Sequence, residues 1–454
     1  MTVARIRGYT DRQSVLQGRS LSFRICDLHG SASVSLPIRI VRLGLVETEL
    51  AVGLAEVHAK PVSAERGWEN NRWPVSYELS VGRDWPSGVY VARVGFEPAD
   101  APGVYFVVKN ASPADVAPIV VQIPTTTINA YNNWGGASLY GYNSPAGAAQ
   151  AVSFDRPQVS DPLWPRGYGF ENEWGLRIKA FAHWLEAAGY PADFITDNDL
   201  HDTPGLLDPY RLFACVGHDE YWSWEMRDQF DAFIARGGNA AIFGGNTSYW
   251  QIRLEPDEIT GAPYRLQVCR RLADQDPIAD PGRKTVTWRE AGRPENLSFG
   301  AGFARGAWRG PGGFGTFKVC QPDHWVFAGT GLEKGDGFGD GGPEALLGYE
   351  TDGVDYVLDA SGAPVPTGAD ATPQSYKILA LAELPDWGTP GNAALGLLTH
   401  PAPAGMVFNA ATTDWAKGLQ TCLPPNGLFA TTTAKITRNV IERLAGISAR
   451  SRTP

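Results

Sequence analysis

Several features that would assign a protein to a common class are scarce or absent in this 454-residue sequence. The five cysteines are scattered, odd in number and without Cys-x-x-Cys spacing, which excludes a disulfide framework or a zinc knuckle and predicts buried, reduced thiols. Basic residues (39) are fewer than acidic ones (49), and the net charge of −10 argues against nucleic acid or a membrane surface as the partner. No apolar run is long enough for a membrane span, and residues 1–7 lack the apolar core of a signal peptide, so a cytoplasmic protein is expected.

Motifs of familiar catalytic schemes are missing as well. The sequence has no Gly-x-Ser-x-Gly nucleophile elbow and no His-x-His or His-Glu-x-x-His pair for zinc. Gly244-Gly245 has neither the spacing of a phosphate-binding P-loop nor that of a dinucleotide-binding loop. Cys215 lies inside an expected strand, ahead of the turn where an activated thiol would have to stand. Tyrosine and carboxylate oxygens are plentiful, so the metal that the composition allows is ferric iron or another hard cation.

What the sequence does contain indicates two or three domains with substantial cores, since 43% of the residues are hydrophobic and 15 are tryptophan. Residues 1–112 are expected to be all-β, because residues 21–25 alternate between apolar and polar types. Similar runs follow at 37–43, 75–81, 88–94 and 104–109. Short strands at this spacing predict a β-sandwich, whose expected role is packing or binding.

From residue 113 to 454 the pattern changes to alternating strands and helices, which predicts an α/β domain. Short apolar runs predict the strands of a parallel sheet, and they lie at 119–123, 193–196, 212–216 and 240–243. Helices are expected at 175–188 and 434–444. Residues 255–375, rich in Gly, Pro and aromatics, are expected to form a β-rich insertion that covers the sheet. Ligands of such sheets bind where the carboxyl ends of the strands meet.

Three clusters of polar and aromatic residues follow expected strands at this edge. The first is 127–140, with three Asn and two Tyr; the second is Gly217-His218-Asp219-Glu220-Tyr221-Trp222; the third is 243–250. A carboxylate of the second cluster is suited to bind a metal or to act as a general base, with His218 as its neighbour or as an acid. In the third cluster, Asn246 is expected to hydrogen-bond a substrate or a metal-bound water.

Each cluster also has a purely structural interpretation. The first could be a turn-rich loop that satisfies its own backbone. In the second, Asp219 or Ser223 could cap a helix while His218 packs in the core. Asn246 could close a tight turn. Three titratable groups side by side favour a functional role for the second cluster, and the other two stay open.

Other acidic residues carry less weight. The run 197–199 (Asp-Asn-Asp) lacks the spacing of a calcium loop and is expected to be a turn at a strand end. Glu171 and Glu173 are expected in the solvated start of a helix. Glu350 lies in the insertion that should cover the site, and it is a candidate for a second carboxylate there.

At the three clusters the sequence resembles the large, catalytic subunit of N,N-dimethylformamidase and its bacterial relatives. The matching stretches, which lie within residues 118–255, are 129–140 (Asn-Ala-Tyr-Asn-Asn-Trp-Gly-Gly-Ala-Ser-Leu-Tyr), 197–201, 217–223, 244–246 and 249–250. Their order along the chain is more specific than any one of them. The resemblance implies a glutamine-amidotransferase-like (flavodoxin-like) parallel-sheet domain joined to the N-terminal β-sandwich.

The resemblance also implies a mononuclear Fe(III) held by two tyrosines and one glutamate in an enzyme that hydrolyses a small amide. Glu220 matches the glutamate, while His218 and Asn246 match polar residues close to the iron. The tyrosines expected as ligands, in order of preference, are Tyr140, Tyr131, and then Tyr142 or Tyr168.

The function expected from the residues and the resemblance together is metal-dependent cleavage of the C–N bond of a small linear amide. Fe(III) would polarise the amide carbonyl and acidify water. His218 or Glu350 would move the proton, and Asn246 would orient the substrate or stabilise the oxyanion. The expected partners are the amide, further copies of the chain in a homo-oligomer and, on the resemblance, a small subunit. Two alternatives stay open: a lyase or glycan-directed enzyme on the same scaffold, and a non-catalytic protein that binds carbohydrate or peptide.

Overall fold

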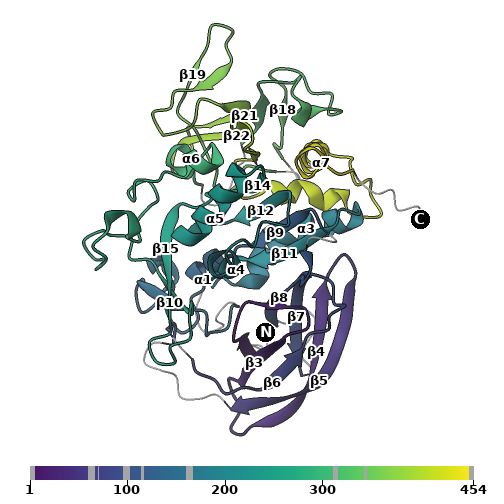
Figure 1. Ribbon diagram of the computed structural model, residues 1–454, viewed down its shortest axis with the longest axis vertical. Helices are drawn as coiled ribbons and strands as arrows, with labels where there is room; N and C mark the ends of the chain where they lie inside the picture. The colour runs from purple at the N-terminus through teal and green to yellow at the C-terminus, as the bar shows by residue number, and fades with distance from the viewer. Residues whose placement is uncertain are drawn as a thin grey trace.

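The computed structural model describes residues 6–59, 67–69, 71–95, 103–113, 117–159, 167–309, 315–341 and 345–448. Within these ranges no helix is both long enough and apolar enough to cross a membrane. The first five residues, part of the segment compared above with a signal peptide, lie outside them. An N-terminal sheet (purple) forms one end of the molecule, an α/β region the middle, and antiparallel strands the other end (Figure 1).

The N-terminal strands form one sheet of eight strands in the order β1-β3-β5-β4-β7-β8-β2, with β6 paired to β3. Its two halves are joined where β3 runs parallel to the end of β5. Phe23, Ile40 and Phe106, from different strands, belong to one shared core. The strands are β1 (Ile6–Thr10), β2 (Ser14–Leu16), β3 (Ser20–Asp27), β4 (Val34–Leu43), β5 (Glu47–Ala59), β6 (Tyr77–Ser80), β7 (Gly88–Val94) and β8 (Val104–Lys109).

The central sheet has nine strands in the order β11-β9-β12-β14-β23-β22-β21-β17-β18. Its first five strands pair in parallel. Strands β9 and β12 are buried along their whole length, which explains their nearly continuous apolar sequences. Strands β12 and β14 extend beyond their expected ends, to His218 and Gly245. The parallel strands are β9 (Ile119–Ile123), β11 (Ala192–Thr196), β12 (Leu212–His218), β14 (Asn239–Gly245) and β23 (Met406–Asn409).

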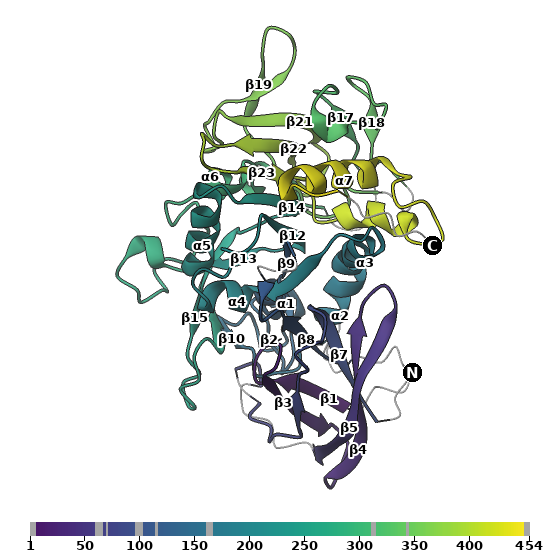
Figure 2. The ribbon, with the colours of Figure 1, turned by 45° about the vertical axis from the view of Figure 1, so that its right-hand side comes forward.

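Helices cover both faces of the parallel strands (Figure 2). Val120 and Val121 are neighbours in β9 and therefore point to opposite faces. On one face, Val121 packs in a core with Trp184 of α3 and Ile441 of α7. On the other face, Val120 packs in a core with Phe230 of α5. These helices, and the short one that lies beside α5, are α3 (Lys179–Ala187), α4 (Asp197–Asp202), α5 (Trp224–Ala235) and α7 (Thr432–Ala445).

Residues 255–375 contain short elements joined by long loops. Two of the strands extend the central sheet beyond its antiparallel pair β21 and β22, and a third joins the four-stranded sheet β10-β16-β15-β13. The division of the chain into two domains and an insertion stays a prediction, as does the likeness to glutamine amidotransferases. The elements of this part and their partners are β10 (Ala151–Ser153), β13 (Tyr221–Ser223), β15 (Trp250–Glu255), β16 (Leu266–Val268), α6 (Asn296–Phe299), β17 (Phe317–Val319), β18 (Gly337–Phe338), β19 (Tyr356–Leu358), β20 (Pro364–Pro366), β21 (Tyr376–Leu384) and β22 (Gly391–Thr399).

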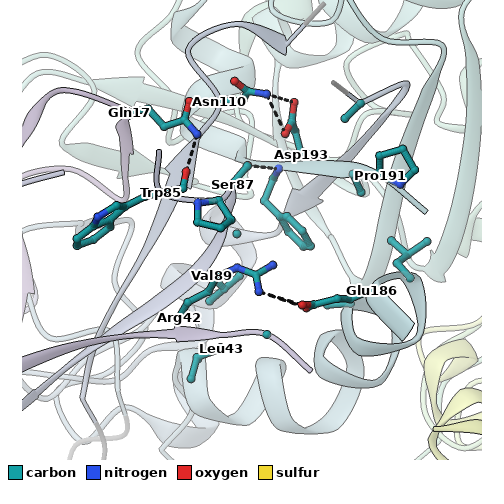
Figure 3. Close-up of a pocket in the computed structure, with 18 of the residues that line it drawn as sticks. Gln17, Arg42, Leu43, Trp85, Ser87, Val89, Asn110, Glu186, Pro191 and Asp193 are labelled. Carbon is teal, nitrogen blue, oxygen red and sulfur yellow. Dashed lines mark hydrogen bonds and ion pairs between the residues drawn. The ribbon is translucent and has the colours of Figure 1, made fainter. Parts of the chain in front are cut away.

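A cavity of about 680 Å³ lies between the N-terminal sheet and the α/β region (Figure 3). Arg42 of β4 pairs with Glu186 of α3 at 3.1 Å, and Asn110 donates to the carboxylate of Asp193 in β11. Polar contacts therefore tie the two regions together beside the cavity. The residues that line it include none from the three polar clusters.

Candidate active site

The site is built where β12 and β14 end side by side, with Gly217 opposite Gly244 and His218 opposite Gly245. Gly217 has a φ of +84°, a conformation that favours glycine. A side chain on Gly244 would come within 2.6 Å of the carbonyl oxygen of Gly217. These glycines allow the two strands to stay paired up to the point where His218 leaves the sheet, and their role is backbone packing.

The first cluster begins as a buried helix, α1 (Thr125–Tyr131), so its first residues are not the turn-rich loop that was one of the two interpretations left open. Thr127 in this helix accepts, through Oγ1, a hydrogen bond of 2.8 Å from the main-chain N–H of Glu220. That bond fixes the turn after β12 against α1. Tyr131 lies in the last turn of the same helix, so one short helix positions both a tyrosine and the glutamate.

The loop after α1, which carries Tyr140, is held by the fully buried side chain of Arg156. The guanidinium donates hydrogen bonds of 2.7–3.1 Å to main-chain carbonyl oxygens of the helix and the loop, those of Asn129, Trp134 and Ala137. Buried backbone carbonyls need such donors. Arg156 therefore gives the loop a defined shape although it has little regular structure.

The phenol groups of Tyr131 and Tyr140 both donate to the carboxylate of Glu220. The oxygen of Tyr131 lies 2.7 Å from Oε2, and that of Tyr140 lies 2.9 Å from each carboxylate oxygen. The two rings stack with their centroids 4.4 Å apart. Two phenol oxygens and one carboxylate therefore meet at a single point.

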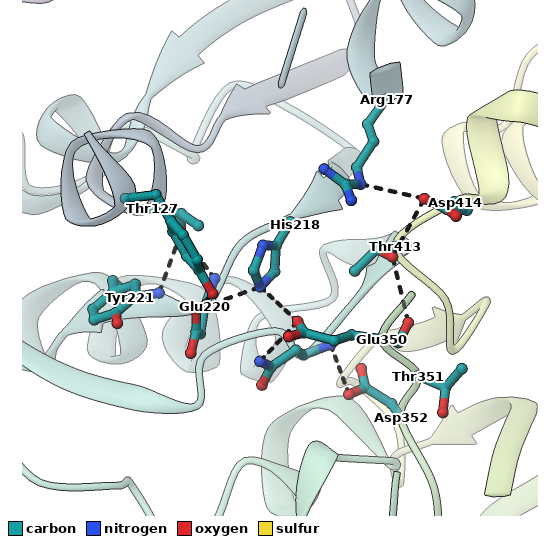
Figure 4. Close-up of polar contacts among 12 residues, drawn as sticks. Thr127, Arg177, His218, Glu220, Tyr221, Glu350, Thr351, Asp352, Thr413 and Asp414 are labelled. Carbon is teal, nitrogen blue, oxygen red and sulfur yellow. Dashed lines mark hydrogen bonds and ion pairs between the residues drawn. The ribbon is translucent and has the colours of Figure 1, made fainter. Parts of the chain in front are cut away.

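His218 links this carboxylate to a second one (Figure 4). Its Nε2 lies 3.4 Å from Oε2 of Glu220 and 2.8 Å from Oε2 of Glu350. The side-chain amide of Asn246 donates to the same Glu350 oxygen at 3.1 Å. Glu350 comes from the segment expected to cover the site, and its carbonyl accepts a hydrogen bond from the N–H of Thr413 at 3.1 Å. The residues expected to act together thus lie in one connected network.

Burial and mutual charge set the ionisation of these groups. Burial, followed by the charge of Glu220, raises the pKa of Tyr131 and that of Tyr140 well above the usual range. Burial also opposes the ionised form of Glu220, but His218, together with the hydrogen bond from Tyr131 and the charge of Arg271, outweighs it and lowers the pKa. Burial disfavours the charged form of His218, yet Glu350 and Glu220 reverse this and raise its pKa to about 10. The two neighbouring glutamates therefore favour the protonated form of His218.

The other two tyrosines considered as ligands lie in different surroundings. The side chain of Tyr142 is 55% exposed, and its ring lies beside that of Tyr140, with 5.8 Å between centroids. The phenol of Tyr168 donates to Glu173. Tyr131 and Tyr140 are therefore the pair that the structure places on Glu220.

The expectation that Glu173 lies in a solvated helix start is wrong. The residue is 1% exposed, and its Oε1 accepts a hydrogen bond of 3.1 Å from the main-chain N–H of His218. Arg177 pairs with its Oε2 at 3.0 Å and with Asp414 at 3.3 Å. The spacing of four residues between Glu173 and Arg177 is typical of a helical ion pair, but a local pattern does not show that such a pair is buried.

The helix that carries this pair is irregular. α2 (Phe170–Glu173) is followed by a π-helical segment, η3 (Trp174–Ile178), before α3 begins. Single turns of π-helix occur frequently at functional sites. Arg177 lies in this turn, and its guanidinium lies 5.1 Å from the ring centroid of Tyr349, whose own ring lies 5.8 Å from that of His218. Arg177 and Tyr349 thus border the site, although no pattern in the sequence indicates a role for either residue.

The expectation of a turn at 197–199 is also wrong, because these residues begin helix α4. Thr196 caps the helix, and Asp197 accepts a hydrogen bond of 2.9 Å from the N–H of Thr126. Asp219, in the central motif, accepts from the thiol of Cys215 at 3.3 Å. Burial, followed by the charge of Asp197, raises the pKa of Asp219 well above its usual range. These two aspartates hydrogen-bond to Thr126 and Cys215 rather than to Glu220.

Among the described residues, no group of three or more His, Cys, Asp and Glu side chains is placed to hold a metal ion. A metal at this site would therefore need the tyrosine oxygens in addition to Glu220. The five cysteines are unpaired, as expected; four of them are buried, as expected, whereas Cys320 is half-buried.

Two curated proteins named N,N-dimethylformamidase beta subunit are similar to this chain. The one from Alcaligenes sp is 24% identical over 332 residues, which are 63% of this chain and 43% of the relative. The one from Paracoccus aminophilus is 24% identical over 330 residues, 67% of this chain and 41% of the relative. The chain thus spans less than half the length of these relatives. A solved structure of a ThuA-like protein from Parabacteroides merdae covers 59% of this chain and 84% of its own, at 13% identity and a TM-score of 0.27, too low to assign a fold.

A family model described as N,N-dimethylformamidase beta subunit-like, C-terminal, matches residues 42–428. The matched segment contains every residue of the Glu220 network. It confirms the dimethylformamidase family and specifies the beta subunit, where the resemblance in the sequence named the large, catalytic one. The chain therefore belongs to the N,N-dimethylformamidase beta subunit-like, C-terminal family.

Proposed function

We propose that this chain carries the active centre of an enzyme that hydrolyses the C–N bond of a small amide with the help of one ferric ion. The observation that supports this most directly is the meeting of Tyr131 and Tyr140 on Glu220, within 2.9 Å and beside His218. Membership of the dimethylformamidase family supports an amide as the substrate.

The residues at this point fit a ferric ion. Fe(III) prefers hard oxygen donors, and Tyr131, Tyr140 and Glu220 offer three of them in a buried position. Two phenolates and one carboxylate would carry three negative charges, which equal the charge of the ion. A zinc site of histidines and cysteines is not supported, because no suitable group of such side chains is found in the described part of the chain.

Amide hydrolysis consumes one water molecule and moves one of its protons to the nitrogen of the departing amine. When bound, the ferric ion would supply Lewis acidity, which polarises a carbonyl group and acidifies water. His218 and Glu350 would transfer the proton, since Nε2 and Oε2 lie 2.8 Å apart. One member of this pair accepts the proton from water, and the pair returns it to the amine nitrogen.

Asn246 would position both Glu350 and the substrate. Its Nδ2 donates to Glu350, its N–H donates to Asp352 at 2.8 Å, and its φ of 51° is uncommon for a residue other than glycine. Its Oδ1 is buried without a hydrogen-bond partner. The acceptor on this constrained residue is therefore available to a substrate or a water molecule.

The active enzyme would contain more than one chain. The two curated relatives are named as subunits, and this chain spans less than half of each. Further copies of this chain, and a small subunit, are the expected partners. Sedimentation of the purified chain, alone and after co-expression with the adjacent open reading frames, measures this directly.

The test of the proposed function is release of amine from small amides by the purified chain loaded with Fe(III). The panel would contain formamide, N-methylformamide, N,N-dimethylformamide and acetamide. We expect amine release from at least one of them, together with a phenolate-to-Fe(III) absorption band that is lost in Tyr140→Phe. Iron-loaded protein that cleaves none of these amides would rule out the amidase. Metal-free protein whose Glu220→Ala variant still binds carbohydrate or peptide would favour a binding protein instead.

A further inference from the structure

A second chain of hydrogen bonds reaches Glu220 through Tyr140. Arg271 donates from Nη2 to the phenol oxygen of Tyr221 at 2.6 Å, and Tyr221 donates to the phenol oxygen of Tyr140 at 2.7 Å. Tyr140 in turn donates to Glu220 at 2.9 Å. Among the described contacts no hydrogen bond joins the side chain of Arg271 or Tyr221 directly to Glu220, so their hydrogen-bonded path to the carboxylate runs through Tyr140.

The direction of this chain is fixed by the chemistry of its members. A guanidinium can only donate, so the phenol oxygen of Tyr221 must accept from Arg271. The single O–H of Tyr221 is then free to point at Tyr140. The oxygen of Tyr140 receives that hydrogen bond on one side and faces Glu220 on the other. A hydrogen bond that begins at a charged donor is stronger than one between neutral groups, and it polarises the next bond in the chain.

Packing holds the chain rigidly. Tyr221 is fully buried in β13, which pairs with β15, and its ring lies edge-on to those of Tyr140 and Tyr131, at interplanar angles of 89° and 85°. The guanidinium of Arg271 lies 4.1 Å from the ring centroid of Tyr140 and 5.0 Å from that of Trp250. The cation therefore contacts the Tyr140 ring on its face while it reaches the Tyr140 oxygen through Tyr221.

We infer that Tyr221 and Arg271 are positioning residues that orient the oxygen of Tyr140 and stabilise negative charge on it when it binds the metal. This inference rests on the proposed function, because it assigns Tyr140 as a ligand. Partners of a metal ligand fix its orientation and tune its electronic properties, and their loss typically weakens metal binding by about 10- to 100-fold.

The first test is Tyr221→Phe, which removes the donating hydroxyl and keeps the buried ring. We expect the affinity for Fe(III), measured by competition with nitrilotriacetate, to fall by about 10- to 100-fold. The phenolate-to-Fe(III) band should move to longer wavelength, because the lost hydrogen bond had lowered the energy of the phenolate electrons. The matched control is Tyr190→Phe, which removes a buried phenol hydrogen bond of 2.9 Å to Glu442 far from the site. The control should keep both the affinity and the band of the parent.

The second test is a double-mutant cycle of Tyr221→Phe with Arg271→Met. Since the two residues act in series, the loss of Fe(III) affinity in the double variant should be smaller than the product of the two single losses, by about threefold or more. Arg271→Lys, which can still donate to Tyr221, should recover part of the affinity that Arg271→Met loses.

The outcomes separate this inference from the proposed function. A parent protein that binds Fe(III) and shows the band, with a Tyr221→Phe variant that keeps both unchanged, overturns the inference alone. Fully multiplicative losses in the cycle also overturn it, because they would mean that Arg271 acts without Tyr221. A parent protein that binds no Fe(III) and shows no band overturns the proposed iron site and this inference together.

Discussion

The main-chain N–H of His218 donates a hydrogen bond of 3.1 Å to the carboxylate of Glu173, which lies 45 residues earlier in the chain. The same carboxylate pairs with Arg177, which also pairs with Asp414. All four residues are buried. The position of the histidine that bridges Glu220 and Glu350 therefore depends on a buried ion pair in an irregular helix.

Glu173→Gln keeps an acceptor oxygen for His218 but removes the charge that Arg177 faces. Breaking one partner of a buried ion pair costs about 3–5 kcal/mol, because the remaining charge stays buried. We expect a loss of this size in the free energy of unfolding measured with urea. The control is Glu47→Gln, whose partner is Arg93 at 2.9 Å and whose side chain is 51% exposed; an exposed pair should contribute less than about 1 kcal/mol. Equal small losses in the two variants would contradict the assigned role of Glu173.

Gly217→Ala would disturb the contact between Glu173 and the end of β12 through a change in the strand. A Cβ at Gly217 would lie 2.5 Å from Oε1 of Glu173 and 2.9 Å from Cβ of Arg177, in addition to the strain of a φ of +84°. Gly292→Ala is the matched control, since its φ is +82° and nothing lies within 4 Å of the added carbon. In both variants the free energy of unfolding should fall by about 1–2 kcal/mol, because alanine is strained in the left-handed conformation.

Only in Gly217→Ala should the free energy of unfolding fall by a further ~1–3 kcal/mol, because the added carbon crowds Glu173 and Arg177. Thermal or urea unfolding of the two variants measures the difference. If Gly217→Ala is no less stable than Gly292→Ala, the close approach of Glu173 to the β12 end is not a tight contact.

A pH effect on stability is expected from Asp352, whose carboxylate accepts the main-chain N–H of Asn246. Burial, helped by the charge of Glu295, raises the pKa of Asp352 to about 8. In the unfolded chain an aspartate has a pKa of about 3.9. Between these values the folded protein keeps a proton that the unfolded chain has lost. The stability from this group is thus fully present below pH ~4 and is lost as the pH rises towards 8, by up to about 1.4 kcal/mol per pH unit.

Asp352→Asn removes this titration while keeping an acceptor oxygen. The free energy of unfolding of the variant, measured at several pH values between 5 and 8, should fall less steeply with pH than that of the parent. Asp386→Asn, at an exposed position, should leave the slope of the parent unchanged. Parallel curves for the parent and Asp352→Asn would show that Asp352 does not hold a proton in this range.

How far the sequence predicts the fold depends on how each strand is buried. The ends of β9 were predicted to the residue, because this strand is buried on both faces and is uniformly apolar. Strand β5 (Glu47–Ala59) was not predicted, although it is longer than any other N-terminal strand. Its outer face exposes Val52 and Leu54, at 63% and 69%, while its inner face carries the small Gly53 and Ala55. The sequence of β5 therefore lacks the alternation of apolar and polar residues from which a half-buried strand is predicted.

Some residues of the site could likewise be predicted from the local sequence, whereas others depend on contacts between distant segments. Tyr131, His218, Glu220 and Asn246 could be grouped from the sequence because each follows a strand whose carboxyl end reaches the same sheet edge. Glu173 could not, because its burial depends on the end of β12 and on Arg177 in a π-helical turn. Arg271 comes from the Gly- and Pro-rich segment, where the sequence has no periodicity that would predict its position.

The choice among the tyrosines also needed three-dimensional information. From the sequence, Tyr140 and Tyr131 were preferred, and Tyr142 and Tyr168 stayed alternatives. The spacing of residues in a loop does not determine which way each side chain points. Arg156 determines the shape of that loop through carbonyl oxygens that lie 19 to 27 residues earlier in the chain. Its role depends on the main-chain path, which residue identities alone do not give. The catalytic and metal-binding roles of the site residues stay predictions until they are measured.

Glu350→Gln tests the proposed proton transfer most directly. The variant keeps the shape of the side chain and the contact with Asn246, but an amide can neither accept nor return a proton in place of the carboxylate. General acid–base groups typically contribute a factor of about 100 to 10,000, so kcat for the amide that is cleaved best should fall by that factor. KM should change by less than about threefold, because Glu350 acts on the proton and the loss falls on the transition state.

Iron content separates this effect from damage to the metal site. Glu350 lies outside the set formed by Tyr131, Tyr140 and Glu220, so the variant should bind Fe(III) and show the phenolate band like the parent. Glu383→Gln, an exposed glutamate in β21, is the control and should keep the kcat of the parent. A Glu350→Gln variant that retains kcat, or that loses activity only because it has lost iron, would contradict a role for Glu350 in proton transfer. A selective loss of kcat in an iron-loaded protein is the outcome that the 2.8 Å contact between His218 and Glu350 predicts.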